Sequence, residues 1–169
     1  MKTVLVPIRG APSDMHLTRA VLPRFLHDSS MQVHLLNVQP ALPARIARHT
    51  ARTARDDWRT ERAGIAMEPV RRALDGHAVP YKVHVAVGDP ADAIAEAARQ
   101  LRCSEILWVA QPRRALLRWL DDVVLDRLLE RTSVPVVLVA RDSVPAWEAV
   151  GVPAALAAAV AAALAISPH

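Results

Sequence analysis

The chain has 169 residues, of which 52% are hydrophobic and 22% charged, so it is globular and long enough for one domain with an appendage. Its formal charge of +4 comes from 19 arginines and 2 lysines against 17 acidic residues, an excess too small to require an acidic partner. A single cysteine excludes a disulfide framework within the chain, and the histidines show no zinc-ligand spacing.

The first half of the chain alternates apolar runs of strand length with segments of helical periodicity. In chain order, we predict a strand over residues 3–8, a helix over 13–26, a strand over 32–38 and a helix over 44–74. The first strand is almost wholly apolar, which is typical of a strand buried on both faces. Ser13 is predicted to cap the first helix, and the second helix is expected to break near Gly64.

The second half repeats the alternation. We predict a strand over residues 81–87, a helix over 90–101, a strand over 105–110, a helix over 121–132 and a strand over 135–140. Asp89 stands where the N-cap of its helix belongs, and Pro90 takes the first helical position, where a missing N–H has little cost. Because alternating strands and helices demand crossover connections, the pattern predicts a largely parallel sheet with helices on both faces.

Three stretches resemble the universal stress protein family. Residues 3–8 (TVLVPI) are similar to its opening strand, residues 87–94 (VGDPADAI) to its G-(D/N)-P-x-x-x-I pattern, and residues 128–139 (LLERTSVPVVLV) to its closing helix and strand. The resemblance implies an α/β fold: a three-layer α/β/α sandwich with a five-stranded parallel sheet in the order 3-2-1-4-5, the adenine nucleotide alpha hydrolase-like arrangement. It also implies a role in stress survival or signalling.

The ATP-binding members of that family carry a glycine-rich loop, G-x2-G-x9-G-(S/T), after the fourth strand. Glycines let backbone amides approach phosphate oxygens, and the following helix terminus favours the anion. The resemblance places Ala110, Arg113 and Asp122 at the three glycine positions and Val123 at the hydroxyl position, in a loop one residue short. These substitutions are expected to weaken ATP binding, because side chains and negative charge stand where bare backbone should meet the phosphates.

The resemblance implies further nucleotide positions at the ends of other strands, namely Pro7, Arg9 and Val38. Arg9 replaces an aspartate that the family uses toward the nucleotide. We interpret these positions, together with those of the altered loop, as vestigial. No cofactor is therefore expected, and neither ATP nor AMP is expected to bind in the usual way.

The predicted function is that of a universal stress protein-like regulatory or protective module that acts through protein surfaces and is not an enzyme. The alternative is a nucleotide-binding stress protein in which Arg113 and Arg114 take the place of the glycine loop. A second alternative is a peripheral membrane protein held at the membrane by its C-terminal segment. No paired carboxylates or nucleophile with a positioned base indicate catalysis.

Six arginines recur three or four residues apart between residues 45 and 62: Arg45, Arg48, Arg52, Arg55, Arg59 and Arg62. On a helix they form one stripe, which we interpret as a solvated face whose aliphatic stems shelter neighbouring alanines and Trp58. The alternative is a basic strip that meets nucleic acid, an anionic surface or an acidic partner. Nucleic acid is not expected, because no aromatic or glycine-rich interleaving accompanies the arginines.

The C-terminal segment differs in composition from the rest. We divide the chain into a universal stress protein-like domain, 1–141, and a linker with a hydrophobic, alanine-rich C-terminal helix, 142–169. The uncharged run 149–166 could just span a bilayer, but its many alanines favour packing on the domain or on a second subunit. We expect a homodimer through strand five, braced by this helix, an unidentified protein partner, and a cytoplasmic location.

Two histidines and the single cysteine are interpreted as structural residues. His34 and His84 lie inside predicted strands and are expected to be satisfied core histidines rather than metal ligands, although the sequence does not show whether they meet. Cys103 is interpreted as an incidental small residue. The alternative is a reactive thiol whose pKa the neighbouring Arg102 lowers.

Overall fold

The computed structural model describes residues 2–41, 51–109 and 118–139, with the side chains of 118–122 left out. The strands in these ranges are β1 (Thr3–Pro7), β2 (Gln32–Gln39), β3 (Tyr81–Val87), β4 (Glu105–Val109) and β5 (Val136–Val139). The helices are the short 3-10 turn η1 (Pro12–Asp14), α1 (Met15–His27), α3 (Arg52–Asp75), α4 (Pro90–Gln100) and α5 (Arg118–Arg131). The predicted alternation of strands and helices is confirmed.

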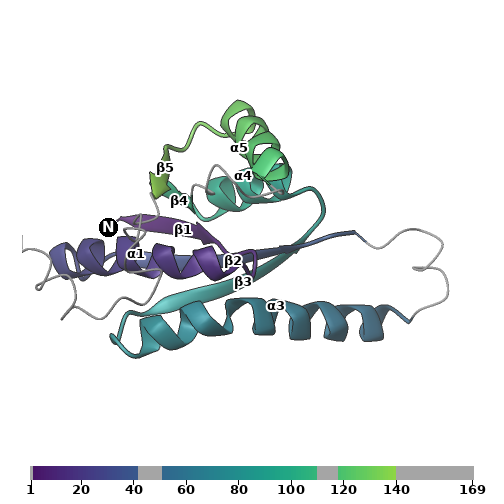
Figure 1. Cartoon of the computed structure of the whole chain (residues 1–169), viewed down its shortest axis with the longest axis horizontal. Helices are drawn as coiled ribbons and strands as arrows, with labels where there is room; N and C mark the ends of the chain where they lie inside the picture. The colour runs from purple at the N-terminus through teal and green to yellow at the C-terminus, as the bar shows by residue number, and fades with distance from the viewer. Residues whose placement is uncertain (1, 42–50, 110–117, 140–169) are drawn as a thin grey trace, which may run out of the picture.

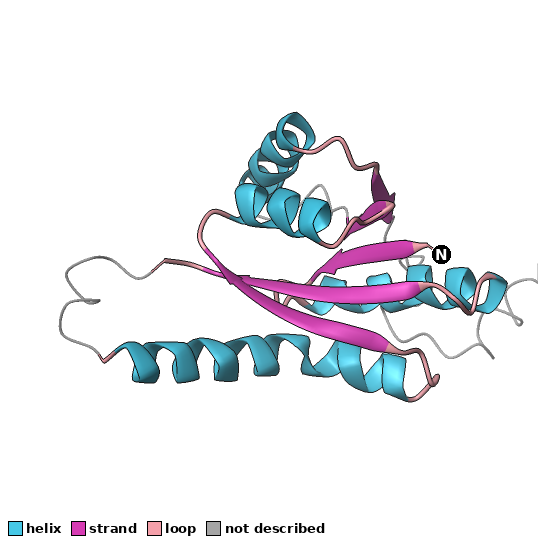
Figure 2. Cartoon of the chain, turned by 180° about the vertical axis from the view of Figure 1, so that it is seen from behind, coloured by secondary structure: helices cyan, strands magenta, loops and turns pink. Residues whose placement is uncertain are grey.

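The strands form one parallel sheet in the order β3-β2-β1-β4-β5, which confirms the predicted topology. In Figure 1, α1 and α3 lie on one face of this sheet, and α4 and α5 lie on the other. The molecule is therefore the three-layer α/β/α sandwich expected from the sequence. Figure 2 shows the same layers from behind, with α3 running below β2 and β3.

A separate hydrophobic core fills each side of the sheet. Val4 and Val6 of β1 pack with α1 and α3, whereas Leu5 packs with α4 and α5. All three side chains are fully buried, because successive strand residues point to opposite faces and both faces are covered by helices. The near-continuous apolar run of β1 is thus explained by its place at the centre of the sheet.

Two of the predicted local signals have opposite outcomes. The Asp89 side chain accepts hydrogen bonds from the N–H groups of Ala91, at 3.0 Å, and Asp92, at 3.3 Å, so the predicted cap of α4 is confirmed. The prediction that Ser13 caps the first helix is wrong. Ser13 lies inside η1, and α1 begins at Met15 with no side-chain cap.

The predicted break near Gly64 is also wrong, because α3 runs without interruption from Arg52 to Asp75. A glycine inside a helix costs only about 1 kcal/mol relative to alanine. The flanking residues Ala63, Met67 and Val70 are buried against the sheet, and their packing offsets that cost. Residues 44–50, which the sequence assigned to the same helix, lie outside the described residues.

The prediction for the C-terminal segment, 142–169, also falls outside the part of the chain that the structure describes. Within the three described ranges, no helix combines the length and apolar character needed to cross a lipid bilayer.

Candidate functional site

The order in which the chain adds strands to the sheet reverses direction between β1, the middle strand, and its neighbour β4. From β1 the chain builds outward to β2 and β3, and it then returns to β4 and continues to β5. In parallel sheets of this kind, ligands bind at the carboxyl ends of the strands on either side of such a reversal. The candidate site is therefore the crevice between the end of β1, at Pro7, and the end of β4, at Val109.

A cavity of about 180 Å³ occupies this crevice. Its lining residues are Pro7, Ile8, Arg9, Leu36, Val38, Pro90, Ile94, Trp108 and Val124. The fold thus brings together Pro7, Arg9 and Val38, three of the positions predicted from the sequence. Apart from Arg9, the lining side chains are apolar or aromatic, so the cavity suits a small apolar group better than a chain of phosphates.

Arg9 and Trp108 form one wall of the cavity together. The guanidinium carbon of Arg9 lies 4.9 Å from the centroid of the Trp108 ring, a distance typical of a cation–π contact. Trp108 itself is only 4% exposed. A cation and an indole ring therefore stand at the place where the family resemblance implies an aspartate facing a nucleotide.

The loop that carries Arg9 is held by the carboxylate of Asp14. Its Oδ2 accepts hydrogen bonds from the backbone N–H groups of Arg9 and Gly10, both at 2.8 Å, and of Ala11, at 3.0 Å. Burial raises the pKa of Asp14 above its ordinary value, although these N–H donors act in the opposite direction. Gly10 adopts a φ of +82°, and a Cβ there would approach the Cβ of Ala66 to 3.0 Å, so the loop requires glycine.

The end of β1 is further positioned by β2. The side-chain amide of Asn37 donates to the carbonyl of Ile8 at 2.8 Å, and the side chain of Gln39 donates to Asn37 Oδ1. Asn37 and Gln39 are both buried. Because these polar groups satisfy one another, the chain segment entering the crevice has a defined path.

Of the remaining predicted site residues, the structure describes the side chain of Val123 alone. Val123 is 46% exposed on α5 and does not line the cavity, whereas its neighbour Val124 does. The backbone of Asp122 belongs to α5, but its side chain lies outside the description, as do Ala110 and Arg113. For Ala110, Arg113 and Asp122, the assignment to a vestigial nucleotide site stays a prediction.

Sequence reasoning missed Trp108, Ile94 and Asp14 as parts of this region. Trp108 lies two residues before Ala110, inside an apolar run already assigned to a strand, and a large aromatic residue beside the end of a buried strand is the signal that would have marked it. Ile94 was assigned only to the apolar face of its helix. Asp14 carried no usable signal, because its role depends on the path of the loop it caps.

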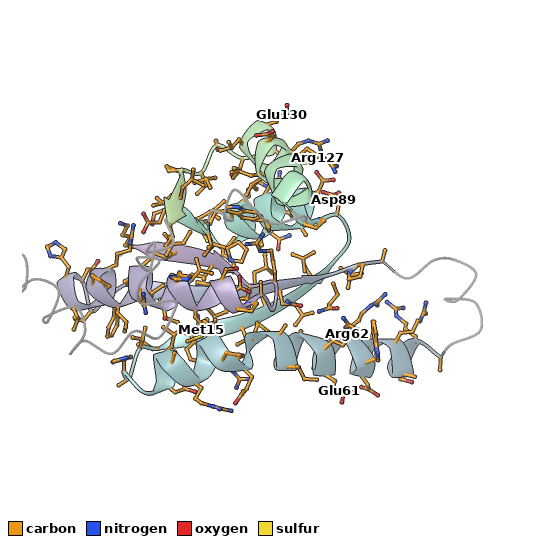
Figure 3. The ribbon with its side chains drawn as sticks, in the orientation of Figure 1. Met15, Glu61, Arg62, Asp89, Arg127 and Glu130 are labelled. Carbon is orange, nitrogen blue, oxygen red and sulfur yellow. The ribbon has the colours of Figure 1, made fainter. Side chains whose placement is uncertain are left out.

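An ion pair beside the crevice joins the two helices on this side of the sheet. Arg127 of α5 donates to Asp89 Oδ2 at 2.9 Å, and Figure 3 shows the two side chains meeting where the start of α4 faces α5. Asp89 uses its other oxygen to cap α4. The pair therefore ties the helix that contributes Ile94 to the helix that contributes Val124.

His34 and His84 meet across β2 and β3, with His34 Nδ1 and His84 Nε2 separated by 2.8 Å and the rings stacked. Burial lowers the pKa of both imidazoles, and the neighbouring His84 lowers that of His34 further. In the described ranges, no group of three or more His, Cys, Asp or Glu side chains is placed to hold a metal ion. The geometry is that of a satisfied structural pair, as the sequence analysis expected of each residue.

Cys103 is buried, and burial raises the pKa of its thiol to about 11. A thiol with so high a pKa is almost wholly protonated at neutral pH, and the protonated form is a poor nucleophile. The structure therefore favours the interpretation of Cys103 as an inert packing residue over that of a reactive thiol.

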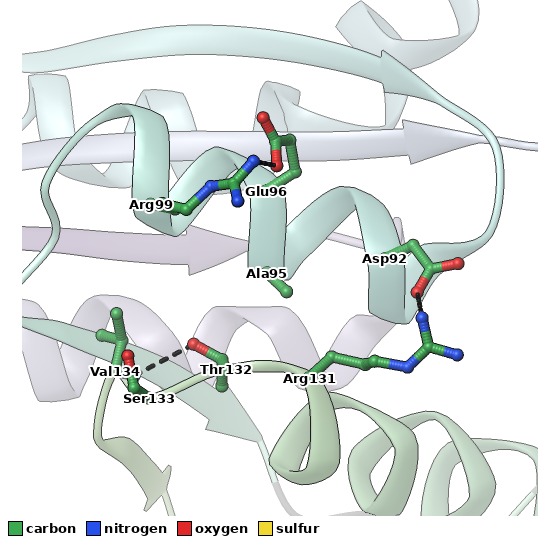
Figure 4. A pocket seen from close by; sticks show the side chains of 8 residues that line it. All are labelled: Asp92, Ala95, Glu96, Arg99, Arg131, Thr132, Ser133 and Val134. Atoms are coloured by element: carbon green, nitrogen blue, oxygen red, sulfur yellow. Dashed lines mark hydrogen bonds and ion pairs between the residues drawn. The ribbon is translucent and has the colours of Figure 1, made fainter.

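A larger cavity, of about 380 Å³, lies away from the crevice, between α4 and the connection from α5 to β5 (Figure 4). Its charged side chains are already paired: Arg131 donates to Asp92 at 2.8 Å, and Arg99 pairs with Glu96. Thr132 Oγ1 accepts from the N–H of Val134 at 3.0 Å. Because its charged side chains already pair with one another on an open surface, this cavity offers little to a charged ligand.

Comparison with known proteins gives a consistent result for the fold. The sequence model of the universal stress protein family matches residues 1–140. A search of curated proteins found no match. Among solved structures, the universal stress protein UspA from Lactobacillus plantarum is similar with a TM-score of 0.64 and 17% identity, covering 82% of this chain and 97% of that one.

Two further structures were solved with nucleotides. A universal stress protein family protein from Arabidopsis thaliana with AMP bound has a TM-score of 0.58 and 15% identity, covering 85% of this chain and 94% of that one. A universal stress protein in complex with cAMP has a TM-score of 0.54 and 20% identity, covering 82% of this chain and 95% of that one. At such identities the likeness concerns the fold.

Proposed function

The chain belongs to the universal stress protein family, and we propose that it is a regulatory or protective module of that family that acts by binding other proteins. In this proposal its crevice does not hold ATP in the manner of the nucleotide-binding members. The protein is not expected to be an enzyme, and its location is expected to be the cytoplasm.

The observation that carries the proposal is the cavity at the ends of β1 and β4. Its volume of about 180 Å³ is below the roughly 300–1,000 Å³ of sites that take drug-sized ligands. Its walls are apolar except for Arg9, which lies against the Trp108 ring instead of projecting from the wall. A nucleotide would need hydrogen-bond partners for its sugar and base as well as room, and the described lining supplies few of either.

The altered loop supports the same proposal from the sequence. Arg113 and Asp122 replace glycines, and Val123 replaces a hydroxyl residue, so backbone amides cannot approach phosphate oxygens as they do in a glycine-rich loop. The aspartates at 121 and 122 would add repulsion close to a triphosphate. Loss of nucleotide binding leaves surfaces as the means by which such a module could act.

A second candidate function is nucleotide binding with Arg113 and Arg114 in place of the glycine loop. The similar structures that contain AMP and cAMP favour it, because they show that this fold can hold adenine nucleotides. Guanidinium groups can bind phosphate through two parallel hydrogen bonds, so two arginines offer a chemically sound substitute.

Isothermal titration calorimetry with ATP, AMP and cAMP separates the two candidates. We expect no saturable binding of any of the three nucleotides up to about 1 mM. A dissociation constant of about 1 mM corresponds to a binding free energy near −4 kcal/mol. Micromolar binding of ATP or AMP would contradict the proposal. The double variant Arg113→Gln/Arg114→Gln then shows whether these arginines are responsible, with Arg99→Gln/Arg102→Gln as a control that removes the same charge elsewhere.

A further inference from the structure

The arginine face of α3 takes no part in the crevice. We define this face as Arg52, Arg55, Arg59 and Arg62, which recur three or four residues apart and so share one side of the helix. Continuing the spacing from Arg59 leads to Ala63 and Met67, which are buried against the sheet. Figures 1 and 2 show the reason for the change from arginine to apolar residues: toward its start, α3 diverges from β2 and β3.

Among the described residues, only one carboxylate pairs with this face. In the part of the chain that the structure describes, no carboxylate forms an ion pair with Arg52, Arg55 or Arg62, whereas Arg59 pairs with Asp56 at 3.1 Å. The Nε atoms of Arg55 and Arg59 are buried without an acceptor. Because an enclosed N–H without an acceptor is unfavourable, an incoming carboxylate would recover free energy by reordering these side chains.

Of the acidic residues of α3 near the arginine face, Asp56 pairs with Arg59, whereas Glu61 points away from the face. Figure 3 shows Arg62 on the side of α3 that faces the sheet, whereas Glu61 projects from the opposite side. Glu61 is exposed, as is Arg62. With the one carboxylate of Asp56 against four guanidinium groups, this side of the helix carries a net positive charge.

A pocket of about 190 Å³ lies between α3 and the segment that leads from β1 into α1. Its lining residues are Gly10, Ala11, Pro12, Asp14, Met15, Ile65, Ala66, Pro69 and Val70. Two of them are large exposed hydrophobic residues, Met15 at 38% and Ile65 at 69%. Trp58, also exposed, precedes Ile65 by two helical turns, and the Arg62 guanidinium stacks 4.9 Å from the centroid of its ring. Basic and apolar side chains therefore adjoin on one surface.

Asp14 adds a specific requirement to this pocket. It is 2% exposed, and while its Oδ2 accepts three backbone N–H groups, its Oδ1 is buried with no hydrogen-bond partner. A buried carboxylate oxygen without a donor favours an occupant that brings an N–H or O–H group. The same negative charge disfavours a phosphate.

We propose that the arginine face and this pocket together bind an acidic, amphipathic segment of a partner protein. Carboxylates of the segment pair with Arg52, Arg55 and Arg62. A tryptophan or tyrosine of the segment enters the pocket between Met15 and Ile65 and donates to Asp14 Oδ1. This inference deepens the proposed function and rests on it, since it names the surface and the partner chemistry of a module that acts by protein contacts.

The alternatives match the surface less well. A nucleic acid presents phosphates, which suit the arginines, but it has no flexible apolar side chain to fill a pocket that contains a buried aspartate. A lipid surface would need a broader apolar area than Met15, Ile65 and Trp58 provide. An acidic peptide with an aromatic anchor satisfies both halves of the surface.

Fluorescence anisotropy tests the inference with a fluorescein-labelled peptide in which one tryptophan lies between pairs of glutamates. The full chain is expected to bind it saturably at physiological salt. The triple variant Arg52→Gln/Arg55→Gln/Arg62→Gln should bind at least about tenfold more weakly. A peptide with alanine in place of tryptophan should lose a similar factor, as should the variant Ile65→Glu.

The matched control is Arg72→Gln/Arg99→Gln/Arg131→Gln, which removes the same charge from exposed arginines that are paired elsewhere on the molecule. It should bind the peptide within about twofold of the parent chain. The inference is overturned if the parent chain shows no binding up to about 1 mM, if a glutamine version of the peptide binds equally well, or if the control triple variant weakens binding as much. Preferential binding of duplex DNA or of phosphatidylserine vesicles would also overturn it. Each of these results is independent of the nucleotide titration. A lack of peptide binding can therefore be distinguished from a failure of the proposed function.

Discussion

At the scale of single residues, Asp14 holds the loop that follows β1. One carboxylate oxygen accepts the backbone N–H groups of Arg9, Gly10 and Ala11, and the residue lies at the boundary between the crevice loop and α1. Hydrogen bonds to an ionised acceptor are roughly twice as strong as neutral ones. The position of Arg9 in the crevice therefore depends on an aspartate that lies outside the crevice.

Replacement of Asp14 should destabilise the folded protein. Asp14→Ala leaves three N–H groups without their acceptor and is expected to lower the free energy of unfolding by about 2–3 kcal/mol. Asp14→Asn keeps an acceptor oxygen and should lose less. Urea denaturation of both variants measures the difference, and an equal loss in the two would contradict the role assigned to the hydrogen bonds.

The histidine pair predicts a pH dependence. Because the pKa of His34 and of His84 is lowered on folding, the unfolded chain binds more protons than the folded chain between the lowered values and about 6.5. Stability from this pair is fully present above pH 6.5 and is lost as the pH falls below it. The variant His84→Thr should therefore show a smaller loss of stability between pH 7 and pH 5 than the parent chain.

Urea denaturation at the two pH values checks this expectation, with His27→Gln as the control. His27 is exposed at the end of α1, and no described ring stacks on it, so its replacement leaves the His34–His84 pair intact. A parent chain that is equally stable at pH 5 and pH 7 would be incompatible with the stacked pair.

At the scale of secondary-structure elements, α4 is fixed by a few short-range choices. Asp89 caps its first turn, Pro90 takes the first helical position, and Ile94 and Ala98 face the core. The ion pair from Asp89 to Arg127 then links α4 to α5. A single carboxylate thus acts both within one helix and between two.

Variants of Asp89 separate these two roles. Asp89→Ala removes the cap and the ion pair and should lower the free energy of unfolding by about 1–2 kcal/mol. Asp89→Asn retains the cap and loses only the charge, so its loss should be less than half as large. Thermal denaturation is the measurement, and Arg127→Gln, which spares the cap, should match the asparagine variant.

The two halves of the long helix α3 lie in different surroundings. Its second half buries Met67, Val70 and Leu74 in the core between α1, α3 and the sheet. Its first half continues the same helical side with arginines, where the sheet has diverged from it (Figure 1). Gly64 and Pro69 lie inside the helix, so its continuity depends on the packing of the buried second half.

At the scale of the whole molecule, β5 forms one edge of the sheet. Leu138 is 56% exposed there, and an exposed edge strand offers unpaired backbone groups to another chain. We expect a homodimer through this strand, as the family resemblance implied. Light scattering coupled to gel filtration should give twice the chain mass of 18.4 kDa.

Leu138→Lys places a charge in that contact and is expected to yield the monomer. Val123→Lys, at an exposed apolar position on α5, serves as its control and should leave the dimer intact. A parent chain that runs as a monomer would rule out this assembly. Removal of residues 145–169 tests whether the C-terminal segment contributes.

What the sequence by itself determined is largely local. The strands were predictable because the strands buried on both faces form nearly continuous apolar runs, and the cap at Asp89 was predictable because capping involves only the next three residues. The topology followed from the alternation of elements together with the family resemblance. The errors at Ser13 and Gly64 arose where a loop path and core packing overrode local preference.

Tertiary structure alone decided which distant residues meet. Arg9 and Trp108 are separated by 99 positions in the chain, and their contact depends on β1 and β4 being neighbours in the sheet. His34 and His84 meet because β2 and β3 pair in one particular register, in which His34 lies beside Lys82 and His84 beside Leu36. The Asp14 oxygen without a hydrogen-bond donor, and the arginines of α3 that pair with no described carboxylate, likewise depend on what surrounds them. Local preferences are set by neighbours along the chain, whereas burial, pairing and charge compensation are set by neighbours in space, which the order of residues does not state.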